Sequence, residues 1–205
     1  MPASGRFFEM PDSLLRPLPP ETIFAMINSG HPAYFILQAS VRAIDGIYNG
    51  SNTFGSGRPE DPRFRRVIKD IRSIEFAGAL DVRFEKHGDL VETSIVLQPH
   101  VSKAADRDIG DFKTVLGIAP NVDELKLISG VVPRKPDQLA LLTRPLQRLL
   151  AELAAGVDVP AADLAAGRAT PSAARGPGSA PQLVHIRSGD QRPADAFAAV
   201  RYSGH

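Results

Sequence analysis

The chain has no cysteine among its 205 residues. Disulfide bonds, thiolate zinc sites and cysteine nucleophiles all depend on that residue. Composition alone therefore excludes these three kinds of chemistry, including redox chemistry carried by thiols.

Net charge and long apolar runs are also scarce. The sequence has 24 basic and 23 acidic residues, a net charge of +1, so it produces no general field that would attract nucleic acid or an anionic membrane. Such contacts would need a local basic patch. No segment approaches the roughly 18 consecutive apolar residues of a membrane-spanning helix, and the first residues lack the apolar block of a signal peptide. We expect a cytoplasmic protein without a membrane span.

Short motifs of common active sites are missing as well. The sequence has no GxSxG, SxxK, HExxH or GxGxxG pattern, and the glycine-rich stretch 50–57 lacks the lysine of a phosphate-binding loop. The five histidines have no short metal-ligand spacing. These observations predict neither a cofactor nor a metal site.

Three amphipathic helices are predicted in the first part of the chain. One covers residues 20–28, a second runs from Pro32 to the Asn49-Gly50 stop, and a third, the basic helix, covers residues 62–73. Each has apolar residues at three- and four-residue steps. For the second helix, these are Tyr34, Leu37, Val41, Ile44 and Tyr48.

The pattern changes to alternation between residues 76 and 98, which predicts two strands joined at Lys86-His87-Gly88-Asp89. Asp108 is expected to cap a short helix that Gly117 closes. A buried strand is predicted over residues 125–132. From Asp137 a leucine helix is expected to reach Leu153, with a kink at Pro145 because proline lacks the backbone donor of a helix interior.

These elements predict an α+β fold with a mostly antiparallel sheet packed against amphipathic helices. Residues 1–19 are expected to be a flexible lead-in, 20–160 a single domain, and 161–181 a linker rich in proline, alanine and glycine. Residues 182–205 follow as a carboxyl-terminal strand pair that could be part of the same domain and could also be truncated.

Four segments give the chain a resemblance to a group of uncharacterised bacterial proteins of unknown function. They are Arg72-Ser73-Ile74-Glu75, Val131-Val132-Pro133-Arg134, Leu141-Leu142-Thr143-Arg144 and Leu150-Ala151-Glu152-Leu153. The resemblance covers roughly residues 34–160 and 183–202 and implies no activity. It also implies that the group continues beyond the position of Tyr202 into another strand and an apolar helix, so this chain would be shortened and would leave a strand edge unpaired.

The aspartates between residues 106 and 111 have two interpretations. Asp106, Asp108 and Asp111 could bind calcium, but Gly117 stands where the EF-hand pattern requires a glutamate. Acidic residues at a helix start also complement the helix dipole without a metal. His100 lies close to this segment in the sequence and is the histidine to test as a general base.

Basic residues are densest in the helix predicted over 62–73, where Arg65, Lys69 and Arg72 share one side. Such a stripe could bind nucleic acid, an acidic protein or phospholipid, but nearby acidic residues neutralise part of it. No exposed aromatic platform of the kind that single-strand binders use is interleaved with it. A solvated helix face is the alternative. On the leucine helix, Arg144 and Arg148, beside Leu146, could line a polar groove or lie on a partly exposed helix face.

Three functions stay open on these grounds. The first is a non-enzymatic protein-interaction or assembly module using residues from the set Arg65, Lys69, Arg72, Arg144, Leu146 and Arg148. The second is an enzyme or small-molecule binder whose site forms only in three dimensions, with His100, Asp106, Asp108 and Arg72 as candidate catalytic residues. The third is nucleic-acid binding through the basic helix. No sequence feature identifies the protein partner or decides between a partner and a homo-oligomer.

Overall fold

The computed structural model describes residues 12–50, 59–88, 90–171 and 184–189, together with residues 194, 196 and 198–200. The helices within these ranges are α1 (Asp12–Leu15), α2 (Pro20–Asn28), α3 (Ala33–Ser40), α4 (Pro62–Phe76), α5 (Lys103–Leu116), α6 (Leu146–Ala154) and α7 (Ala161–Ala165). The strands are β1 (Val41–Ile44), β2 (Ile47–Tyr48), β3 (Leu80–His87), β4 (Leu90–Leu97), β5 (Glu124–Ser129) and β6 (Gln138–Thr143).

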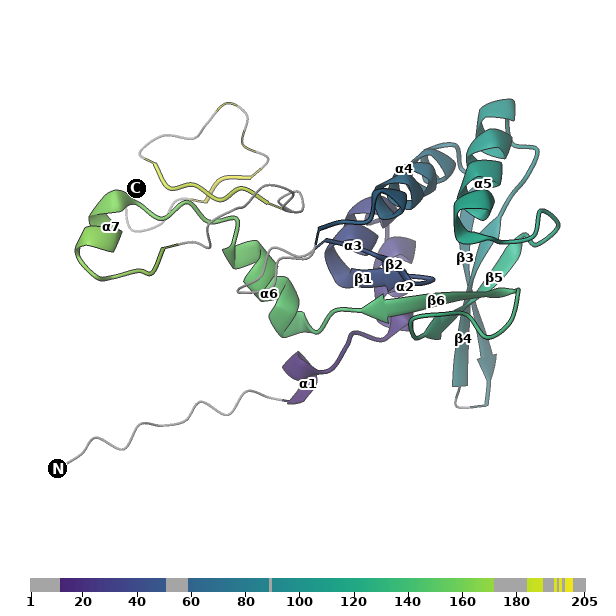
Figure 1. The fold of residues 1–205 in the computed structure, drawn as a ribbon, viewed down its shortest axis with the longest axis horizontal. Helices are drawn as coiled ribbons and strands as arrows, with labels where there is room; N and C mark the ends of the chain where they lie inside the picture. Colours follow the sequence, from purple (N-terminus) through teal and green to yellow (C-terminus); the bar gives the residue numbers. More distant parts are fainter. Residues whose placement is uncertain are drawn as a thin grey trace.

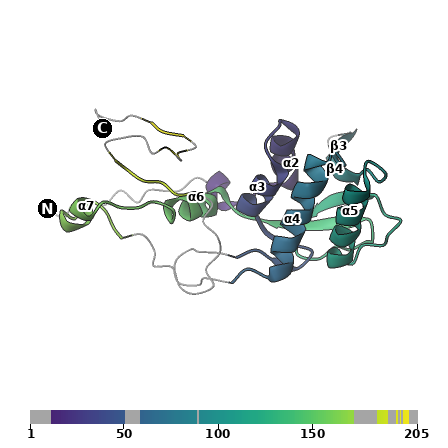
Figure 2. The same cartoon turned by 90° about the horizontal axis from the view of Figure 1, so that it is seen from above.

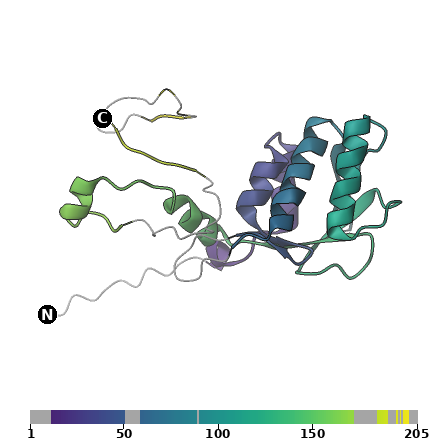
Figure 3. The ribbon, with the colours of Figure 1, turned by 45° about the horizontal axis from the view of Figure 1, so that its top comes forward.

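The strands form one six-stranded sheet in the order β2-β1-β6-β5-β4-β3. Every neighbouring pair is antiparallel except β5 and β6, which are parallel. Helices α2 to α5 lie together on one face of this sheet (Figure 1, Figure 3). The predicted α+β fold with a mostly antiparallel sheet is therefore confirmed.

The core fills the space between these helices and the sheet. Alternate residues of the strands point toward the helices, and the buried cluster joins residues of α2 to α5 to residues of β1, β4, β5 and β6. Its largest fully buried side chains include Phe24, Phe64 and Phe112, one each from α2, α4 and α5. The apolar steps that predicted α2 and α4 are therefore the faces that these helices bury.

The predicted helix from Pro32 to Asn49 is wrong in its second half. Helix α3 ends at Ser40, and the chain continues directly into β1 and the hairpin that joins it to β2. At the turn, Asp45 has φ 46° and Gly46 has φ 76°, the pair of positive values that a two-residue hairpin turn requires. The β-branched Val41, Ile44 and Ile47 suit strands, and their helix-like spacing is coincidental.

The predicted leucine helix is also wrong in its first half. Residues 138–143 form β6, and helix α6 begins only at Leu146. Pro145 is the residue before the helix, with φ −64° and ψ 153°, so it starts α6 instead of kinking it. Proline also disfavours helical backbone at the residue before it, here Arg144, which separates the strand from the helix.

Three smaller expectations differ from the structure. Helix α5 begins five residues before Asp108, after Ser102, whose Oγ accepts a hydrogen bond from the Ala105 N–H at 3.1 Å. Residues 161–165 of the predicted linker form α7. In the predicted carboxyl-terminal strand pair, the described residues contain only an isolated bridge between Val157 and Ile186; most of residues 190–205 lie outside the described ranges.

The turn between β1 and β2 also bonds to β6. The Asp45 N–H donates to the Ala140 carbonyl at 3.0 Å, and the Asp45 Oδ1 accepts from the Ala140 N–H at 2.7 Å. Burial raises the pKa of Asp45 to about 6, although the hydrogen bond from Ala140 opposes this rise. The turn residue therefore extends the β1–β6 ladder with its own side chain.

Replacing Asp45 with asparagine should flatten the pH dependence of stability. The folded pKa lies above the unfolded value of 3.8, so the native state binds more protons and loses stability as pH rises from about 4 to about 6. Asparagine keeps the acceptor oxygen and tolerates positive φ. We expect Asp45→Asn to raise the free energy of unfolding near neutral pH by roughly 1 kcal/mol, a value reduced because the side chain is partly exposed.

Chemical denaturation of the natural chain and the variant across this pH range measures the effect. Asp45→Ala is the matched control, because it removes both the charge and the acceptor at a position with positive φ, and it should destabilise the fold at every pH. An unchanged pH profile in Asp45→Asn would show that another group titrates.

Candidate functional site

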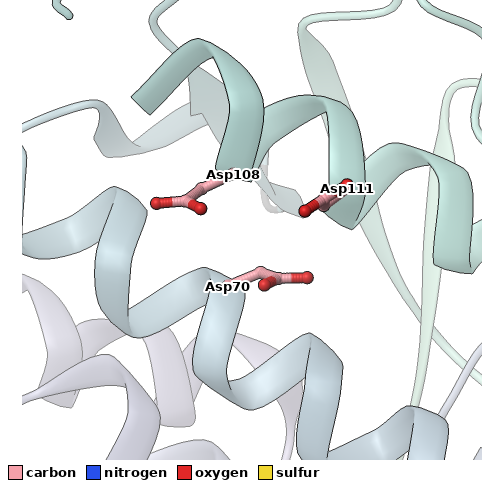
Figure 4. A group of neighbouring side chains, drawn as sticks. All are labelled: Asp70, Asp108 and Asp111. Carbon is pink, nitrogen blue, oxygen red and sulfur yellow. The ribbon is translucent and has the colours of Figure 1, made fainter. Parts of the chain in front are cut away.

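Three aspartates face one another between helices α4 and α5 (Figure 4). Asp70 comes from α4, and Asp108 and Asp111 come from α5, with one carboxylate oxygen of each lying within 4.8 Å of the others. The three-residue step between Asp108 and Asp111 places both on one side of α5. Asp70 is only 2% exposed, because it lies on the face that α4 packs against its neighbours.

Arg66 supplies positive charge to this aspartate cluster. It lies one turn before Asp70 in α4, and its Nε donates to the two Asp70 oxygens at 3.0 and 3.2 Å. Its terminal nitrogen donates to the Asp111 carboxylate. One guanidinium thus links a buried carboxylate of α4 to a carboxylate of α5. The arrangement is an ion-pair network across the contact between the helices.

The electrostatics of the aspartate cluster oppose ionisation of Asp70. Burial raises its pKa, Arg66 lowers it, and the neighbouring Asp111 and Asp108 raise it again. The folded pKa of Asp70 lies above its unfolded value, so the stabilising contribution of its protonated carboxyl is greatest at low pH. This contribution is lost as the pH rises from the unfolded pKa to the folded pKa. Arg66 limits this loss.

Replacing Arg66 with alanine should make stability depend more strongly on pH. The three carboxylates would then repel one another without the guanidinium, so we expect a lower thermal midpoint at mildly alkaline pH than at mildly acidic pH.

Three convergent carboxylates can also hold a hard divalent cation. Millimolar calcium should therefore raise the midpoint of Arg66→Ala and leave that of the natural chain unchanged.

Differential scanning fluorimetry with and without calcium measures both effects. Lys69→Ala is the control, because it removes a positive charge from the same helix outside the aspartate cluster. If calcium stabilised the natural chain as strongly as the variant, Arg66 would not be the group that balances the carboxylates.

His100 and Asp106 lie next to each other. The His100 N–H donates to the Asp106 Oδ1 at 2.7 Å, and the His100 Nδ1 lies 3.9 Å from the Asp106 Oδ2. The imidazole is exposed to solvent, and His100 has φ 71°. In this position Asp106 fixes the backbone that leads into α5, while the ring faces water.

The four candidate catalytic residues do not converge. His100 pairs with Asp106, whereas Asp108 faces Asp70 on the other helix. Arg72 lies on α4 beside α3, with its guanidinium carbon 4.7 Å from the centre of the Tyr34 ring and 5.6 Å from that of Phe76. These contacts divide the four residues among three places. The four side chains therefore do not share one site, and an enzymatic site built from them stays a prediction.

The basic side chains of α4 mostly meet acidic partners. Arg63 pairs with Asp61 at 2.7 Å and Arg65 pairs with Glu60 at 2.5 Å, in addition to the contacts of Arg66. Arg72 instead stacks on the rings of Tyr34 and the exposed Phe76. Phe76 lies four residues after Arg72 on the same helix, so this spacing was visible in the sequence, whereas the contact with Tyr34 was not because Tyr34 comes from another helix.

Arg144 cannot serve as a surface residue, which corrects its place in the predicted interaction set. It is 5% exposed, and its two terminal nitrogens donate to the carbonyls of Ala39 at 3.1 Å and Gly50 at 2.6 Å. Burial lowers its pKa, and Glu152 opposes this effect. The residue holds the end of α3 and the chain after β2 in place.

Helix α6 has an unusual distribution of burial. Leu146 is 38% exposed and Leu150 is 53% exposed, whereas Glu152 is the buried residue of the helix. Arg148, next to these leucines, is exposed. The leucine surface, defined here as Leu146 and Leu150, is therefore apolar and open to solvent.

Comparison with protein-family models, curated proteins and solved structures finds no match to this chain. The resemblance to a bacterial group therefore stays a prediction. Among the described residues, no helix is both long enough and apolar enough to cross a membrane.

Proposed function

We propose that the chain is a non-enzymatic protein-interaction module that binds its partner through the leucine surface of α6. The supporting observation is that α6 exposes Leu146 and Leu150 while it buries Glu152. An amphipathic helix normally turns its leucines inward, and adjacent exposed leucines are typical of a surface that another molecule covers.

The position of α6 favours this function. The helix lies beside the main body and away from the layer formed by α2 to α5 (Figure 2), and the short α1 is its neighbour. A partner can therefore reach it without displacing the core. The proposed mode is a helix received by an apolar groove.

Charge defines the chemistry of the partner further. Arg148 is exposed on α6 and Arg42 is exposed on β1, while the buried Arg144 and Glu152 oppose each other in charge. The exposed side chains Arg42 and Arg148 therefore offer positive charge near the leucine surface. The partner that fits is a protein with an apolar groove bordered by acidic side chains, because such a rim would complement these arginines. We place the encounter in the cytoplasm, as the composition predicts.

The test is to measure binding of a purified partner to the natural chain and to Leu146→Asp/Leu150→Asp. The partner would first be isolated from lysate of the native host by affinity capture. Introducing charges at Leu146 and Leu150 should weaken binding at least about 100-fold, because each leucine that the partner buries contributes roughly 1.5–3 kcal/mol. Gln147→Asp adds a charge to the same helix outside the leucine surface and should have little effect.

Circular dichroism must show that each variant is folded. Unchanged affinity in the folded double variant would reject the leucine surface as the interface. If light scattering instead shows an oligomer of this chain that the double variant abolishes, the partner is a second copy.

Nucleic-acid binding is a second candidate, supported by the exposed Phe76 beside Arg72 and by the exposed Lys69 on α4. An aromatic ring next to cations suits single-stranded nucleic acid, because its bases can stack on the ring while its phosphates meet the cations. Such binding should weaken steeply with salt and with Lys69→Glu. Affinity indifferent to both changes would reject it.

A further inference from the structure

In the part of the chain that the structure describes, strand β3 forms one edge of the sheet and pairs on one side only, with β4. It runs from Leu80 to His87, whereas the strand at the other edge, β2, has only two residues. A long unpaired edge offers a row of backbone donors and acceptors that another strand can use.

The backbone groups that face outward can be identified from the pairing with β4. The Gln98 N–H donates to the Ala79 carbonyl at 2.9 Å, so in an antiparallel ladder the odd-numbered residues of β3 bond to β4. The even-numbered residues therefore point outward. In agreement, the Val82 N–H bonds to the side chain of Asp81 at 2.8 Å instead of to β4.

The charges along β3 are complementary to those of an antiparallel copy. Asp81, Arg83 and Glu85 alternate in sign along the sheet face without helices. Pairing β3 with itself at Arg83 would oppose like charges. A shift of one residue toward either end instead sets Arg83 opposite an acidic residue of the second copy, at two places related by symmetry.

Of the two complementary registers, the geometry favours the one centred on Phe84. A register centred on Val82 would pair only residues 80–84 of the two strands, whereas one centred on Phe84 pairs residues 81–87. Centring on Phe84 sets Arg83 opposite the second Glu85 and brings together the two Phe84 side chains, each 38% exposed. The Phe84 and Lys86 N–H groups then donate across the new ladder, and the Val82 N–H leaves the Asp81 side chain to donate to Lys86 of the second copy.

We propose that β3 pairs antiparallel with β3 of a second copy, with Phe84 on the two-fold axis, so that two six-stranded sheets form one continuous sheet. This inference goes beyond the proposed function and does not depend on it. Strand β3 and helix α6 lie far apart, with the layer of helices α2 to α5 on the side of β3 (Figure 1, Figure 2). Each dimer would therefore present two separate leucine surfaces to partners.

A single engineered cysteine tests the register. The natural chain has no cysteine, so any disulfide must join the engineered residues of two copies. Opposite residues in a hydrogen-bonded pair have Cα atoms about 5.5 Å apart, within the range that a disulfide spans. Phe84→Cys should therefore form a cross-linked dimer under mild oxidation. Lys86→Cys is the matched control, since two such residues would lie more than about 12 Å apart. Cross-linking at Val82→Cys in preference to Phe84→Cys would overturn the register.

Charge exchange tests the contact itself. Arg83→Glu should weaken dimerisation about tenfold, because it opposes like charges at two symmetric places. Adding Glu85→Arg should restore it. A merely structural role for Arg83, through its 2.9 Å ion pair with Glu124, would not be rescued in this way.

Sedimentation equilibrium of the natural chain and both variants gives the dissociation constants. A monomer throughout a series up to about 1 mM would overturn the proposal, as would equal cross-linking at residues 84 and 86. Leu146→Asp/Leu150→Asp should leave the dimer intact, so the β3 contact and the partner-binding surface can fail separately.

Discussion

Replacing Arg144 with alanine should lower the free energy of unfolding by about 3–5 kcal/mol, because two carbonyls lose a buried donor and each such loss costs roughly 1–3 kcal/mol. The guanidinium is buried, and its loss would leave the Ala39 and Gly50 carbonyls without their donor. The buried Glu152 would also lose the positive charge that attracts it. We therefore expect this variant to lose a large share of the roughly 5–15 kcal/mol that stabilises an ordinary domain.

Urea denaturation followed by circular dichroism measures this change. Arg148→Ala removes an arginine four residues later on the exposed side of α6 and should cost less than about 0.5 kcal/mol. Arg144→Lys should be intermediate, because one ammonium cannot reach both carbonyls with the planar geometry of a guanidinium. Equal stability of Arg144→Ala and Arg148→Ala would contradict a structural role for Arg144.

Replacing Asn49 with alanine should cost about 2–3 kcal/mol. The buried Asn49 Nδ2 donates to the carbonyls of Gln38 at 2.8 Å and Val41 at 2.9 Å. Both acceptors flank the point where α3 ends and β1 begins. Leaving buried carbonyls without donors costs roughly 1–3 kcal/mol each, and partial access of water lowers the sum.

Asn49→Asp separates hydrogen bonding from shape. The carboxylate has nearly the same shape but cannot donate, so it should destabilise at least as much as alanine at neutral pH. A double variant with Arg144→Ala should be less damaging than the two single effects added together, because both residues hold the same junction. Full additivity would show that the two sites act independently.

Sequence periodicity predicted the elements whose pattern comes from a local cause. Helices α2 and α4 begin at proline and repeat apolar residues at helical steps, and the β3–β4 hairpin alternates along both strands. In each case the residues that form the pattern also decide the local backbone. The α+β class followed from those elements.

The junction between α3 and β1 could not be predicted in this way. After Ser40 the chain changes from helix to strand without a loop, and its carbonyls from residue 38 to residue 41 meet donors on Asn49 and Arg144. Arg144 lies more than a hundred residues from Ala39 in the sequence. The local signal that could have helped was Asp45-Gly46, a hairpin dipeptide read as helix interior.

Only part of the aspartate cluster could be predicted from the sequence. The spacing of Asp108 and Asp111 drew attention to α5, but Asp70 and Arg66 come from α4, and only the packing of two helices brings the four side chains together. A charged residue within the apolar face of a predicted helix was the available signal for Asp70. Leu146 belonged to the interaction set predicted from the sequence, but Leu150 did not, because the leucines from residue 139 to residue 153 were assigned to one helix whose first half is β6.

The central position of β6 constrains how this protein folds as it is synthesised. Strand β1 pairs with β6, and Asp45 bonds to Ala140, 95 residues later in the chain. During synthesis, the edge of β1 that pairs with β6 therefore stays unpaired until residues 138–143 have emerged from the ribosome. Such non-local pairing closes slowly, and we expect the nascent chain to depend on chaperones during that interval.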